Sequence, residues 1–221
     1  MSTINQIILN ANGQLNEKQL ALIKSAHNKA LERTEKELGR LPNTDIVFLH
    51  NPEYVIPEIG VSGETYNAHT IMMWLDKEFD FTEEDVTRTL CHELNHTVRM
   101  KELGFPNLLF EKIISEGLAD QFEVELEPDL HPITYRKDLD PKDLLERLKS
   151  IREISKSDKY DYFAWFFGDG DAFPRWLGYT IGNYIIDKYC AKYKTKPSDL
   201  TRKPASEFEP FVDYLIKDFD Y

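Results

Sequence analysis

The sequence predicts an α+β fold in which a small N-terminal sheet is followed by a mostly helical C-terminal lobe. Short β-favouring runs occur only before about residue 80. Beyond that point, apolar residues recur at helical spacing in several successive segments. Strands followed by a run of helices are typical of segregated α+β folds rather than of alternating α/β folds. The 221 residues fit a single domain with two lobes, about 1–80 and about 81–221.

The N-terminal lobe is expected to hold one helix and two strands. Residues 16–39 carry apolar side chains at helical spacing, and Gly39 is a suitable stop. DIVFLH, residues 45–50, is a β-favouring run, whereas the proline- and glycine-rich residues 51–67 are predicted to form a loop. HTIMMWLD, residues 69–76, is the second strand. Its side chains alternate between two faces, with Ile71, Met73 and Leu75 on one and Met72 and Trp74 on the other.

The helical lobe is predicted to open at Thr82. Thr82 and Asp85 resemble a capping box, and Gly104 followed by Pro106 ends this helix near Leu103. Proline residues mark several later boundaries, including Pro128, Pro141 and Pro174. The further helices are predicted over about 107–125, 141–156, 174–193 and 209–217.

Composition and charge restrict the classes of function. The 39 acidic and 27 basic residues leave a net charge of −12, which disfavours nucleic acid and anionic membranes as partners. The first residues lack the basic and apolar pattern of a secretory signal, and Cys91 and Cys190 are therefore expected to be free thiols. We expect a cytoplasmic protein.

The motif CHELNH, residues 91–96, predicts a metal site. On a helix, His92 and His96 lie one above the other on the same face and can direct two imidazole nitrogens at one ion. Glu93 flanks that face, where a general base can reach a water molecule without being a ligand itself. The alternative is a helix that carries two unrelated histidines.

The segment IISEGLAD supplies a third ligand candidate, which a catalytic zinc site needs. Glu116 lies twenty residues after His96, and Asp120 follows Glu116 by one helical turn. Gly117 would permit a close approach between helices. We expect Glu116 to bind the ion and Asp120 to accept the outer N–H of a ligand histidine. The alternative is that both are solvated acids.

HELNH followed by EGLAD resembles the gluzincin arrangement of zinc metallopeptidases, in which HExxH precedes ExxxD. TYNAHTIMMWLD upstream and WLGYTIGNYII downstream resemble a small bacterial group of predicted Zn-dependent proteases, a domain family of unknown function. The resemblance covers roughly residues 45–195. It implies a zincin-like fold, with an edge strand lining a cleft above the HExxH helix, and peptidase activity.

Carried over to this chain, the resemblance matches His92, His96 and Glu116 to the zinc ligands, Glu93 to the base and Asp120 to the outer support. Ser115 departs from the pattern, because gluzincins often have Asn just before the third ligand. The resemblance also points to Tyr179 as the donor to a developing oxyanion. A buried tyrosine on an apolar helix is an equal reading of Tyr179, and His131 is a rival donor.

The implied reaction is amide hydrolysis by a Zn²⁺-activated water, with Glu93 as general base. The substrate would be a peptide or flexible protein segment. Strand addition along residues 69–76 would align it, so that His69, Met72 and Trp74 line the substrate site. Two other functions stay open: a zinc-binding regulatory or interaction module with little turnover, and a metal-dependent hydrolase of another amide or ester.

Overall fold

The computed structural model describes residues 2–128, 139–170 and 172–219. They divide into two compact units, Met1–Gly104 and Phe105–Tyr221. The sequence predicts a boundary near residue 80, but the helix that follows this point packs with the sheet and belongs to the first unit. None of the described helices is both long and apolar enough to cross a lipid bilayer.

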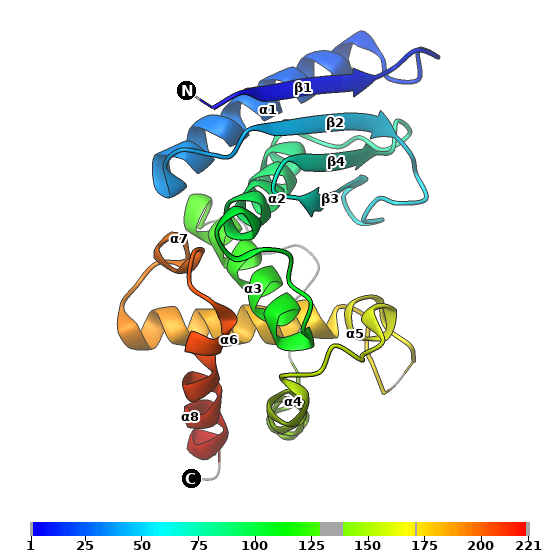
Figure 1. Ribbon diagram of the computed structural model, residues 1–221. Coiled ribbons are helices and arrows are strands. Elements are labelled where there is room, and N and C mark those ends of the chain that lie inside the picture. The colour runs from blue at the N-terminus through cyan, green and yellow to red at the C-terminus, as the bar shows by residue number, and fades with distance from the viewer. Residues whose placement is uncertain (1, 129–138, 171, 220–221) are drawn as a thin grey trace. The chain divides into compact units, whose positions relative to one another are not determined.

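The first unit is built on a four-stranded sheet (Figure 1). Its strands are β1 (Ile4–Leu9), β2 (Thr44–His50), β3 (Val61–Asn67) and β4 (Thr70–Leu75), in the order β1-β2-β4-β3. The first three in that order are parallel, and β3 is antiparallel to β4. The sequence predicts β2 and β4 but misses β1 and treats β3 as loop. Both missed strands lie at the edges, where one side of the backbone pairs with nothing in the sheet.

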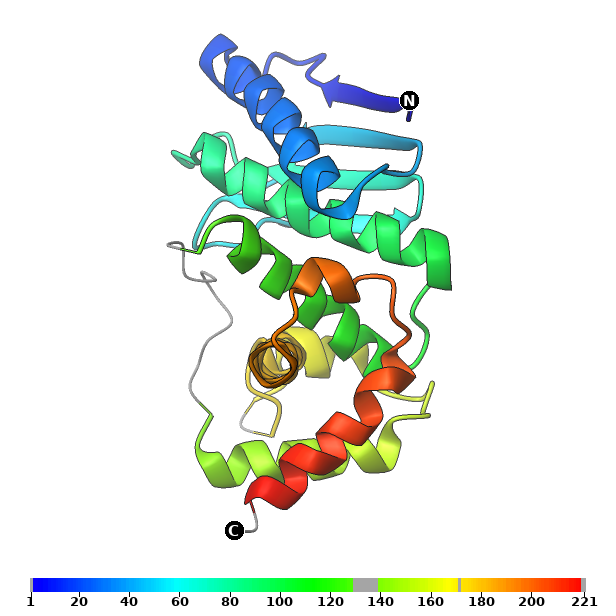
Figure 2. The same cartoon turned by 90° about the vertical axis from the view of Figure 1, so that its left-hand side faces the viewer.

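Two helices, α1 (Glu17–Leu38) and α2 (Glu83–Leu103), cover the same face of this sheet (Figure 2). Both begin with a capping box, at Asn16 and Thr82, and both end at a glycine with positive φ. A glycine relieves the steric cost of that conformation. The core between helices and sheet includes fully buried apolar side chains, those of Ile23, Ala26, Ile46, Phe48, Ile71, Met73, Leu90 and Leu94.

The position of β4 corrects one expectation. β4 pairs with β2 on one side and β3 on the other, so it is an interior strand. The edge strand beside α2 is β3. Strand addition along β4 is therefore excluded, because its backbone groups are already committed to two neighbours. The predicted alternation holds, since Ile71, Met73 and Leu75 are fully buried on one face.

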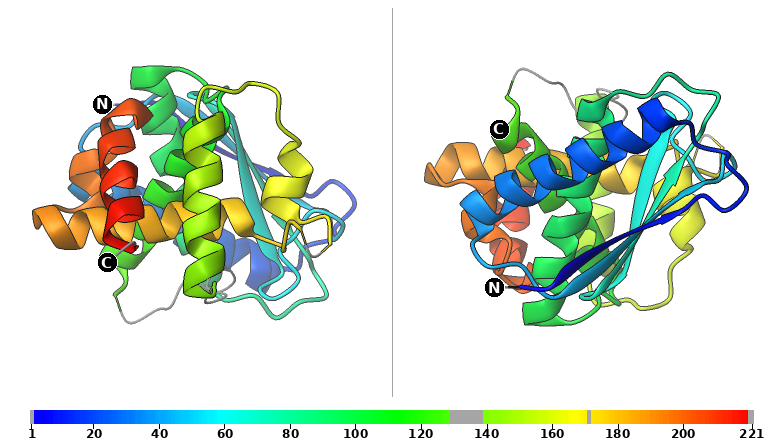
Figure 3. Two further views of the ribbon diagram at one scale, coloured as in Figure 1. Left: turned by 90° about the horizontal axis from the view of Figure 1, so that it is seen from below. Right: turned by 90° about the horizontal axis from the view of Figure 1, so that it is seen from above.

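The second unit is helical among its described residues (Figure 3). The long helices α3 (Leu109–Leu126) and α6 (Leu177–Tyr193) pack against each other. Helices α4 (Pro141–Ile154) and α8 (Glu209–Phe219) lie side by side in the left panel of Figure 3. Arg152 of α4 forms a bidentate ion pair with Asp213 of α8. The shorter elements, absent from the sequence prediction, are α5 (Tyr162–Phe167), α7 (Pro197–Leu200) and the 3₁₀ helix η1 (Ala205–Phe208).

Glycines set the spacing between α3 and α6. A Cβ on Gly117 would lie 2.2 Å from the backbone carbonyl of Gly182, and a Cβ on Gly182 would lie 2.2 Å from the carbonyl oxygen of Ile113. Backbone atoms of the two helices are thus in direct contact, which only residues without a side chain permit. One turn along, the buried Gln121 amide donates to the Oδ1 atom of Asn183 at 3.0 Å. This pair fixes the register of the crossing.

Candidate metal centre

Helix α2 buries several polar and charged side chains whose burial apolar packing does not explain. His92, Glu93 and His96 are 7%, 5% and 6% exposed, respectively. Charged and imidazole side chains are costly to bury unless they bind a partner, a proton or a metal. The same helix carries apolar residues such as Leu90 and Leu94 at full burial, which anchor it against the sheet unit. Its polar face is therefore held in place by its apolar face.

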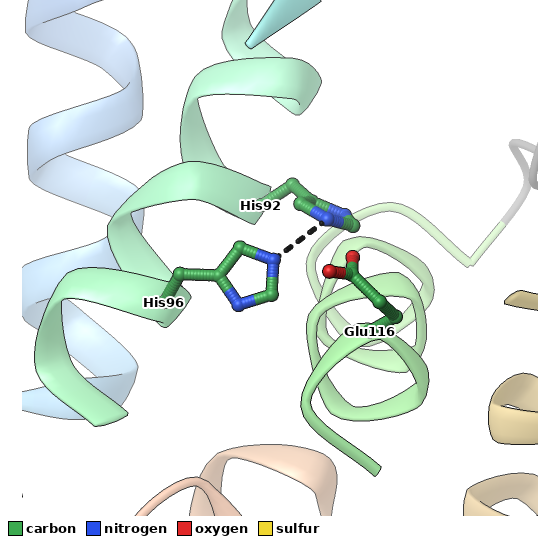
Figure 4. Close-up of side chains that lie close together, drawn as sticks. All are labelled: His92, His96 and Glu116. Carbon is green, nitrogen blue, oxygen red and sulfur yellow. Dashed lines mark hydrogen bonds between the residues drawn. The ribbon is translucent and has the colours of Figure 1, made fainter. Parts of the chain in front are cut away.

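The two histidine rings converge. The Nε2 atoms of His92 and His96 lie 3.1 Å apart, and the rings meet edge to face (Figure 4). Two nitrogens bound to one zinc ion at about 2.0–2.1 Å in tetrahedral geometry would lie about 3.3 Å apart. A hydrogen bond of this length needs a proton on one Nε2, whereas a shared cation needs both nitrogens bare. The spacing fits a zinc ion without rearrangement of the helix.

Glu93 lies against strand β3. The Thr65 hydroxyl is 2.7 Å from Oε2 of Glu93 and 3.0 Å from its backbone oxygen. A Cβ on Gly63 would lie 2.4 Å from Cγ of Glu93, so the acid side chain occupies the space that a side chain at residue 63 would need. The carboxylate is thus held between α2 and the edge strand. Sequence reasoning missed Thr65 and Gly63 because it treated residues 51–67 as loop.

In the second unit, α3 carries the other predicted residues. Glu116 and Asp120 are both buried, and Gly117 between them makes the backbone contact with α6. Figure 4 shows the Glu116 side chain together with those of His92 and His96. Among the described residues, two groups of three side chains could each bind a metal ion, with one ligand atom from each residue. These groups are His92, His96 and Glu116, and His92, Asp120 and Glu123.

Tyr179 lies in the first turn of α6 and is half-buried in an aromatic cluster. Its ring meets those of Phe166 and Trp176 edge to face, with centroids 5.3 and 5.4 Å away. Trp176 has φ of 69°, a left-handed conformation that is strained for a bulky residue. Side chains on both sides thus hold the Tyr179 ring. The rival donor, His131, lies outside the described residues.

The residues predicted to contact substrate are His69, Met72 and Trp74. His69 is exposed in the turn before β4, where its Nδ1 atom is 2.6 Å from the backbone oxygen of Asn43. Met73 packs under the helices, and Met72 and Trp74 project from the opposite face of the sheet. There Trp74 stacks on Tyr54. Met72 and Trp74 therefore point away from the sheet face that α2 covers.

Comparison with known proteins gives two matches. The family model described as "Predicted Zn-dependent protease (DUF2268)" matches residues 21–209. An uncharacterized protein of Mycoplasma pneumoniae is 25% identical over 156 residues, which cover 70% of this chain and 51% of that protein. The chain therefore spans about half the length of this curated relative. The matched family region contains α2, α3 and α6 together with β2, β3 and β4.

Proposed function

Because this chain belongs to the family of predicted Zn-dependent proteases, we propose that it is a zinc metallopeptidase of the gluzincin type, with a zincin-like fold. The observation that carries the proposal is the 3.1 Å approach of the His92 and His96 Nε2 atoms, on a helix that also buries Glu93, the residue after His92. A structural metal site needs ligands alone. A buried acid adjacent to a ligand in the sequence, which could act as a base, favours a catalytic site.

His92, His96 and Glu116 are the proposed zinc ligands. Two imidazoles and one carboxylate are a donor set found in catalytic zinc sites, which keep one coordination position for water or substrate. When bound there, zinc would supply Lewis acidity that polarises the scissile carbonyl and activates water for attack. Asp120 would accept the outer N–H of a ligand histidine and so fix its tautomer.

Glu93 is the proposed general base and acid. Its carboxylate would take a proton from the attacking water and then deliver it to the leaving amine, so that no covalent acyl intermediate forms. Tyr179 is proposed to donate its phenolic hydrogen to the developing oxyanion. Its ring is held by Phe166 and Trp176, so its side chain would lose little conformational freedom in donating that bond.

The proposed substrate is a peptide or flexible protein segment bound along β3. β3 is the last strand of the sheet, and its residues Gly63 and Thr65 touch the proposed base. An extended peptide could pair with its outer backbone edge, which would carry the scissile bond past Glu93. This placement replaces the assignment to residues 69–76.

A Glu93→Gln variant tests the proposal. It retains the shape of the side chain but cannot take a proton, so we expect zinc content equal to wild type and a rate of peptide cleavage lower by roughly 10²-fold or more. The measurement is cleavage of a diverse peptide library alongside metal analysis of both proteins. If both hold zinc and neither cleaves a peptide, the binding-module function is favoured instead. Cleavage of non-peptide amides or esters only would favour the other hydrolase.

A further inference from the structure

We propose that Thr65 is a positioning residue for Glu93, and that Thr65 and Gly63 of β3 together form a socket that fixes the general base. This inference rests on the proposed function, because it concerns how the same site is oriented. It assigns a role to a strand that carries no metal ligand and no reacting group. The two contacts that support it both lie within the first unit.

The Thr65 hydroxyl is well suited to this task. It has one proton to donate, and at 2.7 Å the carboxylate oxygen Oε2 is a closer acceptor than the backbone oxygen at 3.0 Å. A bond to a charged acceptor is stronger than one to a neutral carbonyl. Thr65 is only 6% exposed, so water competes little for the same oxygen. Its β-branched side chain is also stiff about χ1, which limits where the hydroxyl can go.

Gly63 supplies the other wall of the socket. The position that its Cβ would take lies 2.4 Å from Cγ and 2.9 Å from Cδ of Glu93. Gly63 does not have a positive φ, so its backbone does not require glycine. The close approach of the acid side chain is the reason for a residue without a Cβ. An added methyl group would push the carboxylate out of line or push the strand away from α2.

The register of the sheet places both contacts on one face. Gly63 and Thr65 are two residues apart on a strand, so they project toward the same side, where α2 lies. The β3–β4 ladder is regular from Val61 to Thr65 and shifts between Thr65 and Asn67. Thr65 is therefore the last residue held by regular pairing before the irregularity. A peptide that paired with β3 would brace the same strand that orients the base.

Thr65→Val tests the hydroxyl, because valine keeps the shape and loses the donor. We expect kcat for a cleaved peptide to fall about 10- to 100-fold, the loss typical of a hydrogen bond to a charged group, with KM changed less than about threefold. Thr65→Ser should recover most of kcat. Zinc content should equal that of wild type in every variant. Thr44→Val, which removes a buried hydroxyl at the start of β2, is the matched control and should leave kcat unchanged.

Crystal structures of wild type, Thr65→Val and Gly63→Ala give a readout that does not need activity. We expect the Glu93 carboxylate beside Thr65 in wild type and displaced in both variants. An unmoved carboxylate in Thr65→Val, or unchanged kcat in an active enzyme, would overturn the inference. If wild type cleaves no peptide, the proposed function fails by itself, and the carboxylate positions still decide whether Thr65 orients Glu93.

Discussion

His27 shows how burial of one titratable side chain links stability to pH. It lies on α1, is 6% exposed, and meets the Phe48 ring of β2 edge to face. Its Nε2 atom is buried and has no hydrogen-bond partner among the described residues. Desolvation lowers the pKa of His27 below its usual 6.5, despite an opposing contact with the Asn28 side chain. The folded protein therefore disfavours the charged ring.

The sign of the pH effect follows from this lowered pKa. Well above pH 6.5 the ring is neutral in both states, so its contribution to stability is fully present. Below pH 6.5 the unfolded chain binds the proton first, and the free energy of unfolding falls until the pH passes the folded pKa. We expect His27→Leu to weaken this dependence. Urea unfolding at pH 7.5, 6.5 and 5.5 measures it.

The control for this prediction is His69→Gln, which removes an exposed histidine from a turn of the same unit. That variant should retain the wild-type change of unfolding free energy with pH. An equal slope in wild type and His27→Leu would show that His27 does not contribute. Comparing slopes between variants, rather than absolute stabilities, isolates the contribution of His27.

At the residue level, only part of the candidate site could be predicted from the sequence. The convergence of His92 and His96 follows from helix geometry, because residues four apart on one helix always share a face. Thr65 could not be predicted in the same way, since its contact with Glu93 depends on which strand lies beside α2. That order is set by the pairing of β3 with β4, which no local pattern in residues 51–67 reveals. The signal available in the sequence was the spacing of Val61, Gly63 and Thr65, which places all three on one face of a strand.

At the level of elements, helices were predicted better than strands. Helix boundaries are marked by local chemistry such as the Thr82 capping box and the Gly104 stop, and these are visible in sequence. The edge strand β1 has Ile7 and Leu9 on its more exposed face, so hydrophobic alternation gives no clear inner side. β3 has a single aliphatic residue, Val61. Its strand conformation comes from backbone pairing with β4 instead.

The effect of Gly117→Ala on stability tests how closely α3 and α6 pack. Helix propensity predicts a gain in stability, whereas close packing predicts a loss. In an open helix, Gly→Ala stabilises by about 1 kcal/mol. At Gly117 the new methyl group would lie 2.2 Å from backbone atoms of Gly182, which cannot rotate away as a side chain can. We expect Gly117→Ala to lower the free energy of unfolding by about 3 kcal/mol. Denaturant unfolding followed by circular dichroism measures the change.

Ala191→Gly on the exposed face of α6 is the matched control. It exchanges the same two residue types in the opposite direction and touches no crossing, so it should cost only about 1 kcal/mol. A stabilised Gly117→Ala protein would show that the two helices do not approach as closely as described. Because Gly117 follows Glu116, the same variant is expected to lower zinc affinity as well.

For the whole molecule, zinc should act as a ligand of the folded state. The proposed ligands His92, His96 and Glu116 are far apart in the sequence and can meet only in the folded chain. An ion held by all three binds the folded chain and not the unfolded one, so it stabilises the folded chain by mass action. At a free concentration 100-fold above Kd, this amounts to about 2.7 kcal/mol, or a rise in Tm of about 5–10 °C.

Glu116→Gln and Glu123→Gln together decide which acid takes part. We expect zinc to raise Tm in wild type and in Glu123→Gln, and EDTA to reverse the rise, whereas Glu116→Gln should respond weakly. Calorimetry with and without zinc measures all three proteins. The reverse pattern would assign the ion to His92, Asp120 and Glu123, the other candidate group, and would remove Glu116 from the proposed site. Because neutral glutamine retains the size of glutamate, a lost response would reflect the missing charge and not a change in packing.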